Sequence, residues 1–197
     1  MAGMKIKYTK TERARQKKIL KVSQRMLPLF EAMEKSLMVT INGIAEQIEK
    51  IEEAIERNNK KAKPWLAVFS DNWVDVSQLI SVNKIVTRPV DVAGVRVQQY
   101  EKVDFNVATI ENDMPLWVDD AIELMQEQLQ LKAEIKCLEE QIELLEEELL
   151  DVRARVKLFE NRRIPNAQMA IRKIGQKLQD DERLMIATAK VVKTKNE

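Results

Sequence analysis

The chain has 197 residues, 33 of them basic and 32 acidic, with no histidine, one cysteine and 5% aromatic residues. Without an imidazole it cannot build a Ser-His-Asp or Cys-His nucleophile, or a metal site that uses histidine. A single cysteine excludes an intrachain disulfide and a zinc site made of thiolates, and it favours a reducing compartment only weakly. Because so many residues are charged and so few are aromatic, the composition predicts an elongated helical protein rather than a thick globular core.

Charge is segregated along the chain although the net charge is only +1. Residues 1–25 contain nine basic residues and one acidic residue, a local balance of +8. Residues 123–151 contain ten acidic and two basic residues, a balance of −8, and residues 152–197 contain twelve basic and five acidic ones, a balance of +7. The sequence therefore predicts two basic ends separated by an acidic interior.

The first segment, residues 5–60, is predicted to be one long helix. Thr9-Lys10-Thr11-Glu12 has the pattern of a capping box, so the helix should begin there. Apolar residues then recur about every 3.6 positions, as in an amphipathic helix with one apolar face. Asn58, Asn59 and Pro64 are expected to end it. The predicted face consists of Ile19, Val22, Met26, Leu29, Met33, Leu37, Ile41, Ile44, Ile48, Ile51 and Ile55.

The middle segment, residues 61–112, changes character because it is rich in valine. Alternating residues on either side of Ala93-Gly94 predict a β-hairpin, with Pro89 at an edge. The run from Trp65 to Phe69, followed by Trp73, predicts a short amphipathic helix. We interpret this segment as a small mixed α/β knob. It is either a packed connector with its own small core or a surface on which a partner docks.

The third segment, residues 113–192, is predicted to be a second long helix that begins at Asp113-Met114-Pro115. Its apolar residues alternate steps of four and three, an average of 3.5, which is the repeat of a coiled coil. An apolar face continues past Pro165, which should bend the helix locally. The predicted coiled-coil seam consists of Leu131, Ile135, Leu138, Ile142, Leu145, Leu149, Val152, Val156 and Phe159.

Neither long segment can bury its apolar face alone. A connector of about 55 residues is long enough to return the chain antiparallel, whereas parallel pairing would need a connector as long as the helix itself. We therefore predict an all-α-dominated fold, in which the N- and C-terminal segments form a long antiparallel two-helix coiled coil with the β-hairpin knob in the middle. This pairing places both basic ends of the chain together.

No catalytic, cofactor-binding or metal-binding residues are expected. The four glycines do not form a phosphate-binding loop or a dinucleotide fingerprint. Glutamate pairs such as Glu139 and Glu143 are interpreted as a solvated acidic face, and Cys137 as a small, partly buried apolar residue. No apolar run is long enough to insert directly into a membrane. The basic ends could follow phosphates of a nucleic acid, lie on a lipid surface or sit inside an acidic protein collar, and composition does not choose among these.

A resemblance to a known protein family favours one of these alternatives, the acidic protein collar. The segment Arg153–Pro165, continuing to Ile174, resembles the C-terminal signature of the D subunit of the V-type (vacuolar/archaeal) rotary ATPases, and Lys7-Tyr8-Thr9-Lys10, Leu27-Pro28 and Met114–Asp119 resemble its bacterial branch. The signature positions here are Arg155, Val156, Glu160, Ile164 and Pro165. The resemblance implies the central-stalk rotor component of a V-type ATPase or ATP synthase, which transmits torque between the ATP-handling ring and the membrane rotor. It also implies a non-catalytic chain with no cofactor.

The partners that the resemblance implies are the A and B subunits of the ring, the F subunit and the adaptor subunit of the membrane rotor. The complex would be cytoplasmic and peripheral to the inner or plasma membrane, and no nucleic acid is expected. The alternative is a coiled-coil adaptor or a nucleic-acid-associated rod. The residues expected to contact the ring, at the basic end of the shaft, are Arg13, Lys17, Lys21, Arg153, Arg155, Arg162, Arg163, Arg172 and Lys173.

Overall fold

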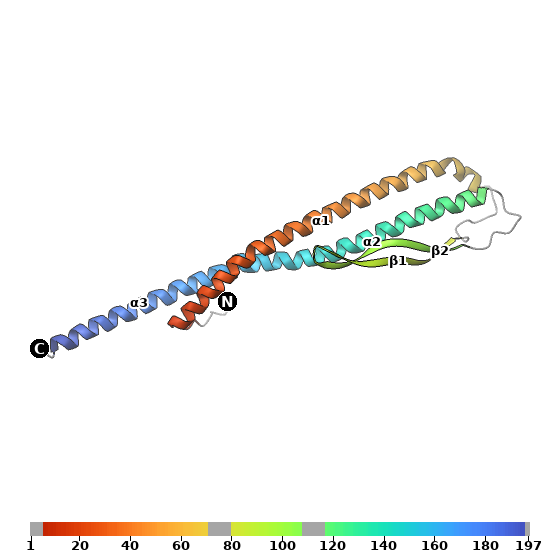
Figure 1. Cartoon of the computed structure of the whole chain (residues 1–197). Coiled ribbons are helices and arrows are strands. Elements are labelled where there is room, and N and C mark those ends of the chain that lie inside the picture. Colours follow the sequence, from red (N-terminus) through yellow and green to blue (C-terminus); the bar gives the residue numbers. More distant parts are fainter. Residues whose placement is uncertain (1–5, 71–79, 108–116, 196–197) are drawn as a thin grey trace. The chain divides into compact units, whose positions relative to one another are not determined.

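The computed structural model describes residues 6–70, 80–107 and 117–195. The elements follow in the order α1 (Lys10–Ser70), β1 (Ile80–Val92), β2 (Val95–Val107), α2 (Trp117–Leu158), the π-helical segment η2 (Phe159–Arg163) and α3 (Ile164–Lys195) (Figure 1). They form two compact units: residues 1–34 with 150–197 make unit 1, and residues 35–149 make unit 2. The predicted helical fold with a small β-hairpin is confirmed.

The start of α1 follows from a side-chain cap. The backbone N–H of Glu12 donates to Oγ1 of Thr9 at 3.2 Å, which satisfies one of the free donors of the first turn. The Glu12 carboxylate does not complete the capping box, because the backbone N–H of Thr9 donates to the oxygen of Lys7 at 3.0 Å, and Oε1 of Glu12 accepts from the Gln16 side-chain amide at 2.8 Å. The sequence therefore predicted the cap correctly and only half of the box.

The buried face of α1 repeats every seven residues, and nine of the eleven residues of the predicted apolar stripe are buried or half-buried. The other two, Val22 and Leu29, are 50% and 62% exposed. The prediction followed apolar side chains and so included these two, whereas the buried face keeps its repeat and accepts polar members. Its buried positions lie seven or fourteen residues apart: Gln16, Ser23, Leu37 and Ile44.

The end of α1 lies ten residues beyond its predicted position, at Ser70. The helix continues through Pro64 to Ser70, although proline lacks an N–H and its ring opposes the carbonyl four residues back. The short helix predicted from Trp65 to Phe69 is therefore the last part of α1. Trp73 and the predicted start of the third segment, residues 113–115, lie outside the described residues.

The predicted hairpin is present and is longer than the alternating residues indicated. Strands β1 and β2 pair antiparallel from Val92 opposite Val95 at the turn to Ile80 opposite Val107 at the open end. Ala93 has a φ of 52° and Gly94 a φ of 87°. Two residues with positive φ form the turn that matches the twist of a two-residue hairpin. Pro89 lies opposite Gln98, in a sheet of two strands where each strand has an outer edge.

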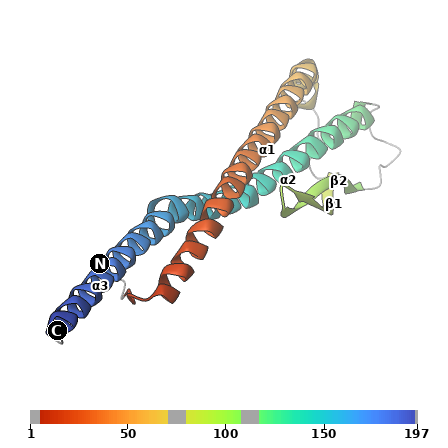
Figure 2. The same ribbon diagram turned by 60° about the vertical axis from the view of Figure 1, so that its left-hand side comes forward.

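Within unit 2 the hairpin packs along α2, as Figures 1 and 2 both show. The Gln141 side-chain amide donates to the backbone oxygen of Gln98 at 2.7 Å, which joins the middle of α2 to β2. Helix α2 therefore uses a second face besides the seam. The apolar contact near the start of α2 consists of Ile80, Val118 and Ile122, with Phe105, Met125 and Leu129 packed against them.

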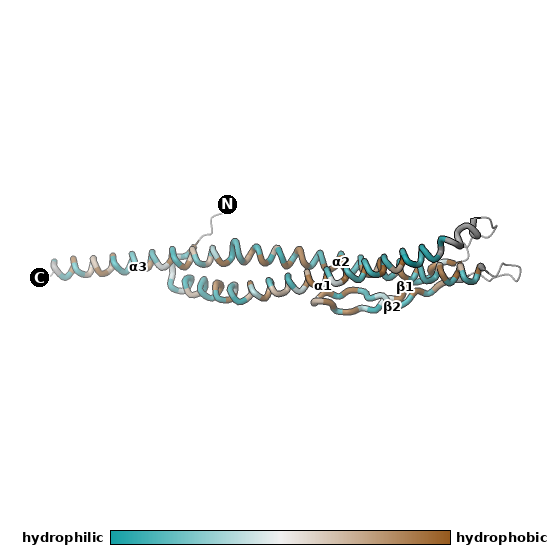
Figure 3. The backbone as a smooth tube through the Cα atoms, turned by 90° about the horizontal axis from the view of Figure 1, so that it is seen from above, coloured by the Kyte–Doolittle hydropathy of each residue, from teal (hydrophilic) through white to brown (hydrophobic). Residues whose placement is uncertain are grey.

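The other face of α2 in unit 2 is the seam with α1. The Asn58 amide donates to Glu127 at 3.3 Å, and the Gln128 amide donates to Asn59 at 2.6 Å. Farther back along α1, Gln47 shares a small cavity with residues 138 and 141, so the two helices run antiparallel here. The apolar residues that recur along both helices are visible in Figure 3. The predicted seam residues of this unit are buried or half-buried: Leu131, Ile135, Leu138, Ile142, Leu145 and Leu149.

Two glycines of unit 2 predict opposite effects of the same substitution. Gly43 lies inside α1 with nothing within 4 Å of an added Cβ, so Gly43→Ala should raise the free energy of unfolding by about 0.5–1 kcal/mol through helix propensity. Gly94→Ala should lower it by about 1–2 kcal/mol, because a side chain is strained at positive φ. Urea unfolding measures both. A gain from Gly94→Ala would contradict the turn geometry.

Candidate functional site

The two helices of unit 1 are held together by contacts whose positions show that the helices run in opposite directions. The ring of Phe30 meets the ring of Phe159 edge to face, with centroids 5.3 Å apart. Glu34 Oε1 accepts from Nε of Arg153 at 2.9 Å. The Arg13 guanidinium lies against the backbone of Gly175. Rising numbers on α1 thus face falling numbers on the partner helix, which confirms antiparallel pairing within this unit.

The family signature coincides with a change of helix type. Residues Phe159–Arg163 form a π-helix, in which the backbone N–H of Ile164 donates to the oxygen of Phe159. Pro165 has no N–H, and its ring would press on the carbonyl four residues back in an α-helix. A wider turn at this point relieves that conflict. The sequence predicted a bend at Pro165, and the structure has a π-turn directly before it.

The π-turn also absorbs one extra residue in the seam. Burial advances by four and three as far as Phe159, and the next seam position is Ile164, a step of five. The regular spacing then resumes, with Ala167 2% exposed and both Ala170 and Ile174 fully buried. Since a π-turn holds one residue more than an α-turn, it keeps one continuous face toward α1. The predicted seam residues of unit 1, Val152, Val156 and Phe159, all lie on this face.

Charge is divided sharply between the units. Unit 1 has 21 basic and 9 acidic residues, a net charge of +12, whereas unit 2 has 12 basic and 23 acidic residues, a net charge of −11. All nine predicted ring-contact residues belong to unit 1. Such a concentration of one sign favours association with a surface of the opposite sign.

The predicted ring-contact residues differ in how exposed they are and in whether they already have a partner within the chain. Arg13 and Arg153 are half-buried between helices, and the guanidinium of Arg163 lies 4.9 Å above the ring of Phe159. Arg155 is 3.8 Å from Asp151 in an exposed pair, which adds little stability. The remaining members are exposed and have no ion pair with the described residues: Lys17, Lys21, Arg162, Arg172 and Lys173.

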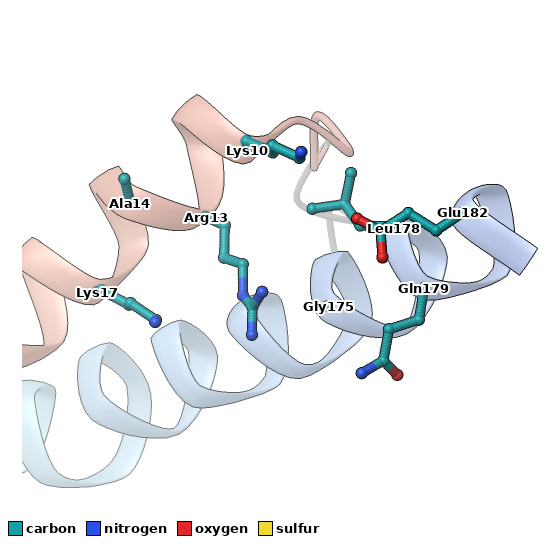
Figure 4. Close-up of a pocket in the computed structure, with 8 residues that line it drawn as sticks. All are labelled: Lys10, Arg13, Ala14, Lys17, Gly175, Leu178, Gln179 and Glu182. Carbon is teal, nitrogen blue, oxygen red and sulfur yellow. The ribbon is translucent and has the colours of Figure 1, made fainter.

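A groove of about 340 Å³ lies between the first turns of α1 and the middle of α3 (Figure 4). Three basic side chains leave α1 toward α3, and a glycine forms part of the opposite wall. Sequence reasoning placed two of these cations at the ring surface but not in a groove. The groove is lined by Lys10, Arg13, Ala14 and Lys17 of α1 and by Gly175, Leu178, Gln179 and Glu182 of α3.

In unit 2 a buried thiol lies beneath the hairpin. Cys137 is 5% exposed, as its interpretation as a small apolar residue required. Burial raises the pKa of its thiol above the ordinary value, and the charge of Glu140 raises it further. Burial likewise raises the pKa of Tyr100, with a smaller contribution from Glu134. Both groups are held in their neutral forms, which suits packing and not nucleophilic chemistry.

The raised thiol pKa predicts a loss of stability in alkaline solution. Above about pH 8.5 an unfolded cysteine begins to lose its proton, while the folded thiol keeps it. The unfolded state then binds fewer protons, so the free energy of unfolding falls as the pH rises. Cys137→Ala should flatten this decline when urea unfolding is followed from pH 8 to 10. An unchanged slope in the variant would assign the decline to other groups, of which Tyr100 is the next to test.

The described residues contain no group of three or more histidine, cysteine, aspartate or glutamate side chains placed to hold a metal ion. None of the helices among residues 6–70 and 117–195 is both long and apolar enough to cross a bilayer. The long paired helices, the seven-residue repeat and the hairpin on α2 define an antiparallel coiled-coil protein with one strongly basic unit.

Comparison with known proteins identifies the family. The sequence profile of the ATP synthase D subunit matches residues 12–194. The chain is 30% identical over 195 residues to the V-type ATP synthase D subunit of Borreliella burgdorferi, covering 96% of this chain and 94% of that protein. It is 28% identical over 196 residues to the protein of the same name from Chlamydia muridarum, with 96% and 95% covered.

The chain belongs to the family of ATP synthase D subunits. It is a central-stalk component of a V-type ATPase, and its general role is the transmission of torque. Sequence reasoning missed three features of the site: the π-turn, the pairing of Glu34 with Arg153, and the groove. Only the π-turn could have been predicted from the sequence, because the apolar spacing lengthens to five residues between Phe159 and Ile164, directly before Pro165.

Proposed function

We propose that unit 1 is the end of the shaft that turns inside a ring of A and B subunits, and that its exposed cations face acidic side chains of that ring. Nucleotide hydrolysis then takes place on the ring and not on this chain. The chain then biases which ring site is open as it rotates.

The separation of charge carries the proposal. A bearing that permits rotation needs diffuse attraction more than interlocking apolar contacts, because apolar side chains that fit one orientation resist leaving it. Unit 1 has a net charge of +12 and several cations that pair with none of the described residues. Long-range attraction of this kind centres a shaft and is weakened by salt.

The seam supports the mechanical part of the proposal. A shaft that transmits torque must resist bending and twisting, and two helices joined by a continuous buried face are stiffer than either helix alone. In unit 1 the buried face continues through the π-turn to Ile174. The ring-contact residues that project outward therefore rest on a packed pair of helices.

Binding to an assembled ring tests the proposed surface. The variant Arg155→Gln, Arg162→Gln, Lys173→Gln removes three exposed cations of unit 1. It spares Arg163, whose stacking on Phe159 would confound the result. At about 0.5 kcal/mol for each lost contact, the dissociation constant should rise about tenfold. The variant should also reduce the salt dependence of binding, and its thermal unfolding should match that of the parent protein.

The matched control is Lys50→Gln, Lys60→Gln, Lys136→Gln, which removes the same charge from exposed positions of unit 2. This control should bind the ring within about twofold of the parent protein, because its three residues lie outside the proposed surface. Both variants lose the same net charge, so the comparison removes that general effect. Equal weakening by the two variants, or none by either, would contradict a specific basic surface.

In this arrangement the acidic unit 2 binds the F subunit and the adaptor subunit of the membrane rotor. The complex is cytoplasmic and peripheral to the inner or plasma membrane. Reconstitution tests this arrangement. ATP hydrolysis by the ring should stay coupled to ion transport only when this chain is present. Salt-sensitive binding of DNA or RNA by the isolated chain, without any effect on coupling, would favour the nucleic-acid-associated rod instead.

A further inference from the structure

The groove between α1 and α3 in unit 1 contains an unsatisfied buried donor. Nε of Arg13 exposes less than 1 Å² and has no hydrogen-bond partner among the described residues. A guanidinium donor left in this state costs free energy, which an oxygen acceptor would recover. Most buried donors in folded proteins are paired, so this one calls for an explanation.

The glycine at position 175 explains how the guanidinium reaches this position. An added Cβ would lie 3.4 Å from Nη2 and 3.6 Å from Cζ of Arg13, so the guanidinium occupies the space that a side chain at this position would take. Because Nε exposes less than 1 Å², a ligand reaches it only when the arginine side chain turns about its outer torsions.

The rest of the lining adds positive charge. Lys10 and Lys17 lie three and four residues to either side of Arg13, so all three share one face of α1, and Figure 4 shows them projecting toward α3. Glu182 is the one acidic residue in the lining, and it forms no ion pair with the described residues. The lining therefore has a net charge of +2. Gln179 adds an uncharged amide donor on the opposite wall.

We propose that this groove binds a small oxyanion with the chemistry of a phosphoryl group. The guanidinium of Arg13 supplies two parallel donors to two of its oxygens, which is the geometry that arginine offers phosphate. Lys10 and Lys17 supply point charges at the rim. The groove of about 340 Å³ has room for inorganic phosphate or for the phosphate chain of a nucleotide. This site lies within one unit, and it is independent of any ring.

Titration of the isolated full chain with inorganic phosphate tests the proposal. Sodium chloride is adjusted so that the ionic strength stays constant, because screening alone would otherwise mimic binding. In the ¹⁵N-labelled protein the Nε–H resonance of Arg13 should shift and saturate as phosphate is added. Arg13→Gln should weaken phosphate binding about tenfold or more, as expected for the loss of a bidentate charged contact.

Lys18→Gln is the matched control, because Lys18 is exposed on α1, carries the same charge and does not line the groove. It should bind phosphate within about twofold of the parent protein, since diffuse charge contributes little at fixed ionic strength. The direct observation of the Arg13 resonance in the parent protein keeps the test valid even if Arg13→Gln changes the local packing.

Two further ligands distinguish the sources of the phosphoryl group. Tripolyphosphate and ATP carry the same phosphate chain, so equal affinities would assign the site to the chain alone, and tighter binding of ATP would assign it to a nucleotide. Either outcome supports the proposal if Arg13→Gln weakens binding of the ligand concerned. An unmoved Arg13 resonance, or equal weakening by Arg13→Gln and Lys18→Gln, would overturn it. Neither result would affect the proposed contact with the ring, which is tested on exposed cations outside the groove.

Discussion

Replacing Leu145 with aspartate is expected to lower the free energy of unfolding by about 3–5 kcal/mol. Leu145 is fully buried in the seam of unit 2. The substitution removes a large apolar side chain and leaves a carboxylate facing the apolar residues of α1. The carboxylate has to become protonated or open the seam to water, and both cost free energy. Urea unfolding followed by far-ultraviolet circular dichroism measures the loss.

Leu144 provides the matched control, because it is the neighbouring residue and is 42% exposed. Leu144→Asp adds the same charge to the same acidic stretch but keeps it in contact with water. We expect a loss of no more than about 1 kcal/mol, as for most surface substitutions. If the two variants unfolded at the same urea concentration, α1 and α2 would not pair through the face that contains Leu145.

Phe159→Ala should have the second largest effect, a loss of about 3–4 kcal/mol. The side chain is 8% exposed, its ring meets that of Phe30, and the guanidinium of Arg163 covers its outer face. Truncation leaves a cavity at the point where the helix widens into the π-turn. The cost includes the lost burial of the ring and the cavity that remains where the helices do not close over it.

A double-mutant cycle with Phe30→Ala separates the ring contact from general loss of packing. The coupling energy should be about 0.5–1.5 kcal/mol, which is the usual strength of an edge-to-face aromatic pair. Leu158→Ala serves as the comparison, since Leu158 precedes Phe159 and is 44% exposed. A coupling energy of zero would mean that the two rings do not touch in solution.

Periodicity predicted the second helix of the pair better than the first, for a physical reason. The seam of α2 consists of apolar residues, so the residues themselves mark its repeat. The buried face of α1 includes the polar residues Gln16 and Ser23, and beside it the half-buried Glu34 pairs with Arg153 of the other helix. No apolar signal marks such positions, and the predicted face included exposed apolar residues such as Leu29.

The functional surface was predictable only in part. The segregation of charge is visible in the sequence, and together with the predicted antiparallel pairing it places the basic residues of both ends together. Whether a given cation is free depends on what the antiparallel partner brings beside it. Arg153 meets Glu34 across 119 residues of sequence, and Arg13 meets Gly175 across an even longer separation. Local pattern does not reveal such contacts.

The seven-residue repeat also gives the paired helices a handedness. An apolar repeat of 3.5 residues lags behind the 3.6-residue turn of a straight helix, so two helices that keep this contact wind around each other in a left-handed sense. A twist applied in the winding direction presses the seam side chains together, and the opposite twist draws them apart. Each pair of helices therefore resists one direction of rotation more strongly than the other, so the mechanical response of this protein is chiral.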